Sequence, residues 1–139
     1  MLVVMEPPDD AIDAISSLVW MEDGIIIAAA TGEPSTAESL AQVFAAIRDL
    51  IGEGPRRPGL FDARKWLGGD VAAWTSGVAE LESTFTAYAM LIEPGSSVGK
   101  GPFFLDRLLI PSRAFTDEAE ALKFLRGFLR DQEAPTSQS

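Results

Sequence analysis

The chain has 139 residues, a formal net charge of −10 and 47% hydrophobic residues, and it contains no histidine and no cysteine. This length and apolar fraction are typical of one domain with its own hydrophobic core. The composition excludes disulfides, thiolate nucleophiles, histidine-based catalytic triads and zinc sites built from cysteine or histidine.

The chain starts with a short apolar run, Met1–Met5, which is followed by acidic residues and prolines. A secretory signal peptide has a basic start and a longer apolar core, and a membrane span needs about 20 apolar residues. The sequence has neither pattern, so we expect a cytoplasmic protein without integral membrane association. We expect residues 1–16 to lead into one domain over 17–131, with a polar tail over 132–139.

A β-hairpin is predicted near the start of the domain. Apolar runs at 18–21 and 25–30 flank the pair Asp23-Gly24. An Asp-Gly pair readily adopts the positive φ angles of a tight hairpin turn. The two runs are therefore expected to pair as neighbouring antiparallel strands.

A helix is predicted after the hairpin, opened by Pro34 and Ser35. Ser35 and Glu38 have the spacing of a capping box, in which each side chain accepts a hydrogen bond from a backbone amide at the helix start. Apolar residues then recur every three or four positions over 40–50, which predicts one buried helix face. Glycine and proline dominate 52–59, so the helix is expected to end near residue 52 and a loop to follow.

The rest of the chain alternates strands with helices. Short, mostly apolar segments predict strands at 60–63, 87–92 and 113–115. Helix-start signals before apolar stripes predict helices that begin at Asp70, Pro102 and Thr116. The stripe of the first of these helices consists of Val71, Trp74, Val78, Leu81 and Phe85. The order is ββαβαβαβα, which predicts a single α/β domain with a mixed sheet flanked by about four helices.

Charge is unevenly distributed along the chain. Residues 1–53 carry ten acidic residues and one arginine, a net charge of −9, whereas residues 54–139 carry a net charge of −1. Such an acidic half repels phosphate backbones, so nucleic acid is not an expected partner. The acidic half either keeps the protein soluble or faces a basic partner.

Basic residues and a tryptophan follow the third predicted strand. Arg64, Lys65 and Trp66 leave its carboxyl end, which is the edge where open α/β sheets bind ligands and partners. An exposed tryptophan is a strong interface anchor. Arg56 and Arg57 precede the strand and are expected at the opposite end of the sheet.

The loop Gly95-Ser-Ser-Val-Gly-Lys-Gly101 lies between a predicted strand and a predicted helix, where phosphate-binding loops occur. A Walker A motif has four residues before its Gly-Lys pair and a Ser or Thr after it, whereas this loop has three residues and then glycine. Nucleotide binding is therefore not predicted. Two alternatives stay open, an ordinary connection and a looser anion site formed by Gly95, Ser96, Ser97, Gly99 and Lys100.

Paired carboxylates can perform acid–base chemistry, and Asp62, Asp70 and Asp106 lie near predicted loops. Nothing in the sequence brings two of them to a nucleophile, and no aspartate cluster resembles a calcium or magnesium site. We therefore expect no catalytic residue, no metal and no cofactor.

Three features together resemble STAS-like domains. They are the order of the elements, the Asp62 strand followed by an Asp70-led helix, and the ending Ile110-Pro-Ser-Arg-Ala-Phe-Thr-Asp-Glu-Ala-Glu-Ala-Leu-Lys-Phe-Leu125. The resemblance is to the stage II sporulation protein AA-like, anti-sigma-factor-antagonist-related proteins and covers roughly residues 17–130. It implies a mixed sheet flanked by helices and a non-catalytic role in binding a protein or a small ligand.

The resemblance also implies a phosphorylation switch that this chain does not preserve. In antagonists of this family, a partner kinase phosphorylates a serine in Asp-Ser-Ser-Gly at the start of the helix after the third strand. Asp70 matches the aspartate, but Val71 and Ala72 stand in place of the serines. Phosphorylation of Ser76, a turn further along, would be a new arrangement of the switch.

Two functions stay open at this point. The first is a non-catalytic STAS-like regulatory module that binds a protein partner through Arg64, Lys65, Trp66 and Asp70. The second is a carrier of a small anion or lipid-like ligand held under the 93–101 loop. Self-association through the hairpin edge or a helix face, which would give a homodimer, is also left open.

Overall fold

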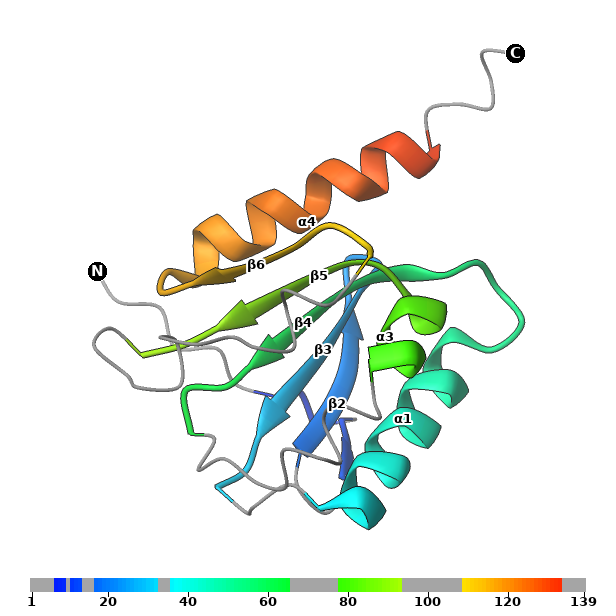
Figure 1. Cartoon of the computed structure of the whole chain (residues 1–139), viewed down its shortest axis with the longest axis vertical. Coiled ribbons are helices and arrows are strands. Elements are labelled where there is room, and N and C mark those ends of the chain that lie inside the picture. Colours follow the sequence, from blue (N-terminus) through cyan, green and yellow to red (C-terminus); the bar gives the residue numbers. More distant parts are fainter. Residues whose placement is uncertain are drawn as a thin grey trace.

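The computed structural model describes residues 7–9, 11–13, 17–32, 36–65, 78–93 and 109–133. Within them, six strands form one sheet in the order β1-β2-β3-β4-β5-β6 (Figure 1). The strands are β1 (Ile12–Asp13), β2 (Ser17–Glu22), β3 (Ile25–Ala30), β4 (Arg57–Asp62), β5 (Phe85–Leu91) and β6 (Ser112–Phe115). The helices are α1 (Ala37–Ile51), α3 (Val78–Thr84) and α4 (Glu118–Glu133). Neighbours from β1 to β3 are antiparallel, and neighbours from β3 to β6 are parallel.

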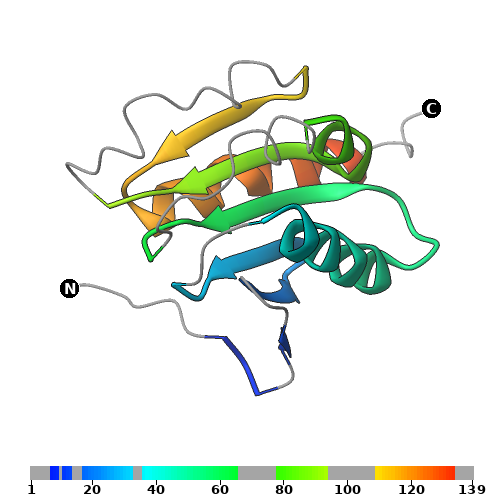
Figure 2. The same ribbon diagram turned by 60° about the horizontal axis from the view of Figure 1, so that its bottom comes forward.

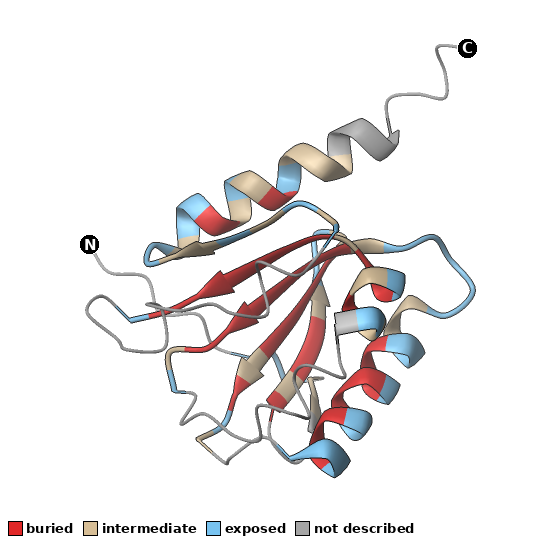
Figure 3. Cartoon of the chain, in the orientation of Figure 1, coloured by how far each residue is buried: buried red, intermediate tan, exposed pale blue. Residues whose placement is uncertain are grey.

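Helices cover both faces of this sheet. α1 and α3 lie on one face and α4 lies on the other, as two views show (Figure 1; Figure 2). β3, β4 and β5 are buried along most of their length, whereas α1 is buried only on its inner side (Figure 3). A strand covered on both faces needs no polar side, which explains the apolar runs at 25–30 and 87–92. The predicted α/β domain with a mixed sheet flanked by helices is therefore confirmed.

Each face of the sheet has its own hydrophobic core. The α1/α3 face is filled by bulky side chains, among them Phe44, Phe61, Phe85 and Tyr88. The α4 face includes small buried side chains on both the sheet and the helix, among them Ala87, Ala89 and Ala121. α4 packs on this face against β4 and β5.

The predicted hairpin is confirmed. β2 and β3 pair from Ser17↔Ala30 to Glu22↔Ile25, which leaves a two-residue turn. Asp23 has φ of 54° and Gly24 has φ of 82°. Two consecutive positive φ angles match the twist of the flanking strands, which is why this turn type favours Asp-Gly.

The helix starts differ from the predictions by one residue each. Thr36, rather than Ser35, caps α1, and Thr36 and Ser39 form the capping box in place of Ser35 and Glu38. The short hydroxyl of Ser39 reaches the Thr36 amide at 2.8 Å, so no longer side chain is needed. Asp117 Oδ1, rather than Thr116, accepts from the first turn of α4, at 3.3 Å from the Ala119 nitrogen. The predicted end of α1 is confirmed, because the Gly52 amide donates to the Arg48 carbonyl.

β4 begins at Arg57 rather than at the predicted residue 60, so part of the expected loop is strand. The register of β4 against β5 shifts between Arg57 and Gly59, and such an irregularity accommodates Pro58 because proline cannot donate to a regular ladder. The prediction that Phe85 lies on a helix stripe is wrong, because Phe85 is the first residue of β5. Its ring covers Gly59 so closely that a β carbon there would lie 2.4 Å from the ring.

The remaining predictions have mixed outcomes. The edge strand at 113–115 is confirmed as β6, the last strand of the described sheet. β1 was not predicted, because its two residues are too few to show a pattern. The helix starts expected at Asp70 and Pro102 lie outside the described residues.

Candidate functional site

The carboxyl ends of β3, β4, β5 and β6 meet at one edge of the sheet, where α4 begins (Figure 1). Register pairs near this edge join Leu18, Ala29, Asp62, Leu91 and Phe115 into one row from β2 to β6. Paired residues on neighbouring strands project to the same face, and the four apolar members contribute to the core under α4. Asp62 is therefore the charged member of this five-residue row, which continues to Asp13 of β1, and it is 8% exposed.

Arg64 neutralises this buried carboxylate. Arg64 Nε donates to Asp62 Oδ1 at 2.9 Å, and Arg64 Nη2 donates to Asp62 Oδ2 at 2.8 Å. The Arg64 backbone nitrogen also donates to Oδ1, at 3.1 Å. The side chains of Arg64 and Asp62 are 22% and 11% exposed, so the pair is largely shielded from solvent. The bidentate contact fixes the turn that ends β4, and this hydrogen bond is the main reason that the pKa of Arg64 is raised.

Glu118, the first residue of α4, is the third charged group of this cluster. Its Oε1 atom is shielded from solvent and has no hydrogen-bond partner within the described residues. Burial of the carboxyl group, the largest cause, raises the pKa of Glu118, while attraction by Arg64 lowers it and repulsion by Asp62 raises it. Both Asp62 oxygens already accept from Arg64, so this guanidinium only partly compensates Glu118.

The described part of this edge is more acidic than the sequence suggested. Lys65 is exposed directly after Arg64, but Glu93 and Asp117 are exposed at the ends of β5 and β6. Together with Asp62 and Glu118, four acidic residues stand against two basic ones. The sequence predicts Arg64, Lys65 and Lys100 here, and Lys100 lies outside the described residues. Of the two that are described, Arg64 is paired with Asp62 and Lys65 is exposed.

Several predicted site residues lie outside the described residues. These are Trp66, Asp70 and Ser76, and the loop residues Gly95, Ser96, Ser97, Gly99 and Lys100. Arg57 is confirmed at the opposite end of the sheet, where it begins β4. The role of Asp62 was missed by sequence reasoning, although an acidic and a basic residue two positions apart after a buried strand is the signal that could have found it.

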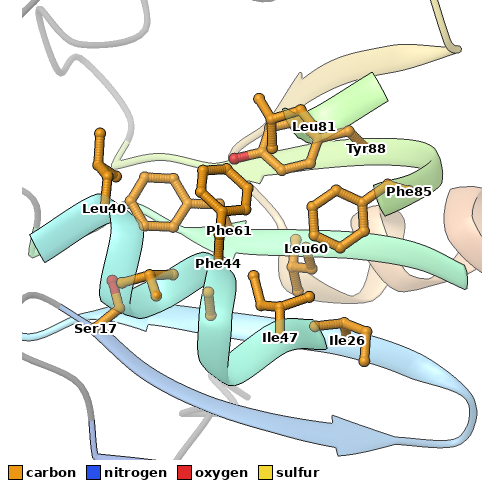
Figure 4. A pocket seen from close by; sticks show the side chains of 12 residues that line it. Ser17, Ile26, Leu40, Phe44, Ile47, Leu60, Phe61, Leu81, Phe85 and Tyr88 are labelled. Carbon is orange, nitrogen blue, oxygen red and sulfur yellow. The ribbon is translucent and has the colours of Figure 1, made fainter. Parts of the chain in front are cut away.

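The core between α1, α3 and the sheet contains a void of about 20 Å³, lined mainly by apolar side chains including Phe44, Leu81 and Tyr88 (Figure 4). That volume holds about one water molecule, whereas small-molecule pockets measure roughly 300 Å³ or more. Burial raises the pKa of Tyr88 above its ordinary range. Tyr88 is therefore a neutral core residue rather than an ionisable site group.

The described residues also lack a metal-binding cluster and a membrane-spanning helix. They hold no group of three or more acidic, histidine or cysteine side chains placed to bind a metal ion. They also form no helix with the length and apolar character needed to cross a bilayer.

Comparison with known proteins gives a family and a fold. Residues 19–129 match the family described as Domain of unknown function (DUF7793). The fold is similar to the crystal structure of an uncharacterized protein of the DUF3478 family with a SpoIIAA-like fold, from Shewanella loihica PV-4. The TM-score is 0.60 at 13% sequence identity, covering 87% of this chain and 99% of that one. None of the curated proteins matches this chain.

The strand order, the helices on both faces and this likeness confirm the resemblance seen in the sequence. The chain belongs to the DUF7793 family, and its single α/β domain has a SpoIIAA-like fold.

Proposed function

We propose that the protein is a non-catalytic, STAS-like regulatory module that binds a protein partner at the carboxyl edge of its sheet. The observation that carries this proposal is the shielded Asp62–Arg64 pair, which holds the end of β4 rigid beside exposed Lys65. A rigid edge loses little conformational entropy on binding, which favours its use as an interface.

A binding role agrees better with this edge than catalysis does. Asp62 is a poor general base, because both of its oxygens already accept hydrogen bonds from Arg64. Glu118 is the carboxyl group of this cluster that keeps an unpaired oxygen. The chain also has no histidine or cysteine to act as base or nucleophile. The partner surface would include Arg64, Lys65, Trp66 and Asp70.

We further propose that the partner interaction does not depend on phosphorylation at the position used by the family. Val71 and Ala72 follow Asp70 and carry no hydroxyl group. If Ser76 had replaced the family serine, Ser76→Ala would change partner binding, and our proposal expects no change.

The test is capture of partners by immobilised protein from a lysate of the source organism. We expect Lys65→Glu combined with Trp66→Ala to reduce capture of a specific protein at least tenfold while the circular dichroism spectrum stays unchanged. Lys123→Glu is the matched control, because Lys123 is an exposed lysine on α4, away from this edge. Equal capture by the double variant and the wild type would overturn the assignment of the site.

Native mass spectrometry of the untagged protein should precede capture, because it identifies a second copy of the chain as the partner. Self-association gives integer multiples of 14.9 kDa. If the multiples persist in the double variant, the self-contact lies elsewhere than the carboxyl edge.

A further inference from the structure

The opposite end of the sheet carries a larger surface hollow. Its volume is about 480 Å³, within the range of roughly 300–1,000 Å³ for small-molecule sites. It is formed where α1 and α3 end and β4 begins, three places that lie side by side (Figure 1). Its lining residues are Arg48, Ile51, Gly52, Gly54, Arg56, Glu80, Ser83 and Thr84.

Two arginines line this hollow, in a part of the chain that is otherwise acidic. Arg48 and Arg56 are the only basic residues among the first 56, and the fold brings both to the same hollow. Arginine presents five N–H donors in a planar fork that matches the oxygens of phosphate and carboxylate groups. The hollow therefore concentrates donors for an anion.

Two helix ends also border the hollow, and free helix-end carbonyls would oppose an anion. Several of these carbonyls are already satisfied within the fold. The Gly52 amide donates to the Arg48 carbonyl, and the Gly54 amide donates to the Ile51 carbonyl. At the end of α3, Arg56 Nη1 donates to the Glu82 carbonyl at 2.7 Å. This arrangement weakens the opposition from the helix ends.

Glu80 is the group that would compete with an anion. Arg48 Nη1 donates to Glu80 Oε2 at 2.8 Å, in a pair whose side chains are 55% and 46% exposed. Only one Arg48 nitrogen takes part in this ion pair. An exposed single contact of this kind contributes little and is easily exchanged for another acceptor.

We propose that this hollow binds the phosphoryl group of a small ligand between Arg48 and Arg56. Arg48 keeps or exchanges its contact with Glu80. The Ser83 hydroxyl lines the hollow but already donates to the Glu80 carbonyl at 3.1 Å, so the two arginines supply the donors for the ligand. The site is separate from the carboxyl edge, so this proposal stands independently of the proposed function.

The experiment is an NMR titration of the full chain with inorganic phosphate and with glycerol 3-phosphate. We expect amide shifts centred on Gly52, Gly54 and Ser83 that saturate. We expect Arg48→Gln and Arg56→Gln each to weaken the affinity roughly five- to tenfold. We expect Glu80→Gln to strengthen it about two- to fivefold, because this variant removes the competing charge without removing a donor.

Arg113→Gln is the matched control, because Arg113 is an exposed arginine on β6, away from the hollow. It should leave the affinity unchanged. Vesicles containing phosphatidic acid, compared with phosphatidylcholine vesicles, distinguish a lipid headgroup from a soluble phosphate as the source of the phosphoryl group. Three outcomes would each overturn the proposal. They are shifts that persist unchanged in Arg48→Gln, weaker binding by Glu80→Gln, and the absence of saturable shifts with any probe.

Discussion

The two ends of the sheet each carry an arginine–carboxylate pair, but the pairs differ in geometry and burial. At the carboxyl edge, Arg64 binds Asp62 through two nitrogens, and the two side chains are 22% and 11% exposed. At the amino end, Arg48 binds Glu80 through one nitrogen, and the side chains are 55% and 46% exposed. Solvent competes with the second pair far more than with the first.

This difference indicates that the Asp62–Arg64 pair stabilises the fold, whereas the Arg48–Glu80 pair can exchange its partners. Asp62 and Arg64 are two residues apart and fix one turn, so breaking the pair leaves a poorly solvated charge in place. Arg48 and Glu80 belong to different helices and stay hydrated, so each can find another partner at low cost. Stability should therefore depend strongly on the first pair and weakly on the second.

The largest effect is expected from Asp62→Ala. This variant leaves the Arg64 guanidinium largely shielded without its main acceptor, and we expect a loss of about 2 kcal/mol in the free energy of unfolding. Urea denaturation followed by circular dichroism measures the loss. Glu93→Ala, which removes an exposed carboxylate at the same edge, should change stability by less than about 0.5 kcal/mol. Similar values for both variants would show that the Asp62–Arg64 pair has no special role.

Glu118→Gln is expected to change stability less than Asp62→Ala does, and to increase it rather than lower it. The folded state raises the pKa of Glu118, so folding favours the protonated form, and ionisation costs stability as pH rises through the folded pKa. We therefore expect the glutamine variant to melt at a higher temperature than the wild type at pH 7. The difference should shrink towards zero below about pH 4, where the unfolded carboxyl is also protonated.

Melting curves of both proteins at the two pH values check this expectation. A lower melting temperature for Glu118→Gln at pH 7 would mean that attraction of the carboxylate to the start of α4 outweighs its burial. A difference that does not vary with pH would mean that the titration of Glu118 is not its cause.

The smallest effect is expected from Glu80→Gln. Exposed ion pairs contribute roughly 0–1 kcal/mol, and salt screens them further. We expect the free energy of unfolding to change by less than about 0.5 kcal/mol at physiological ionic strength. A loss as large as that of Asp62→Ala would remove the distinction between the two ends.

The sequence predicted most of the fold because its signals were local. Asp23-Gly24 determined the hairpin turn, Gly52 marked the end of α1, and the apolar runs marked five of the six described strands. The errors arose where a distant contact decides the local structure. Pro58 and Gly59 have loop-like composition, yet they lie in β4, where Gly59 pairs with Ile26 and Tyr88 and the Phe85 ring fills the space above it.

The candidate site was only partly predictable for the same reason. Its position at the carboxyl edge followed from the alternation of strands and helices. The pairing of Arg64 with Asp62 was not predicted, because charge counting along a sequence does not show which side chain of a strand is buried. The hollow at Arg48 and Arg56 depends on how α1 and α3 end beside β4, a tertiary arrangement with no local sequence signal.

The contact of Phe85 with Gly59 has a consequence for how this family can vary. A side chain at position 59 would occupy the volume that the Phe85 ring now fills, and nearby Tyr88, whose ring centre lies 5.6 Å from that of Phe85, limits the space for the ring to move. The two positions are therefore coupled: relatives that carry a larger residue at 59 should carry a smaller one at 85. Covariation between the start of β5 and the middle of β4 would thus record this one contact across the evolution of the family.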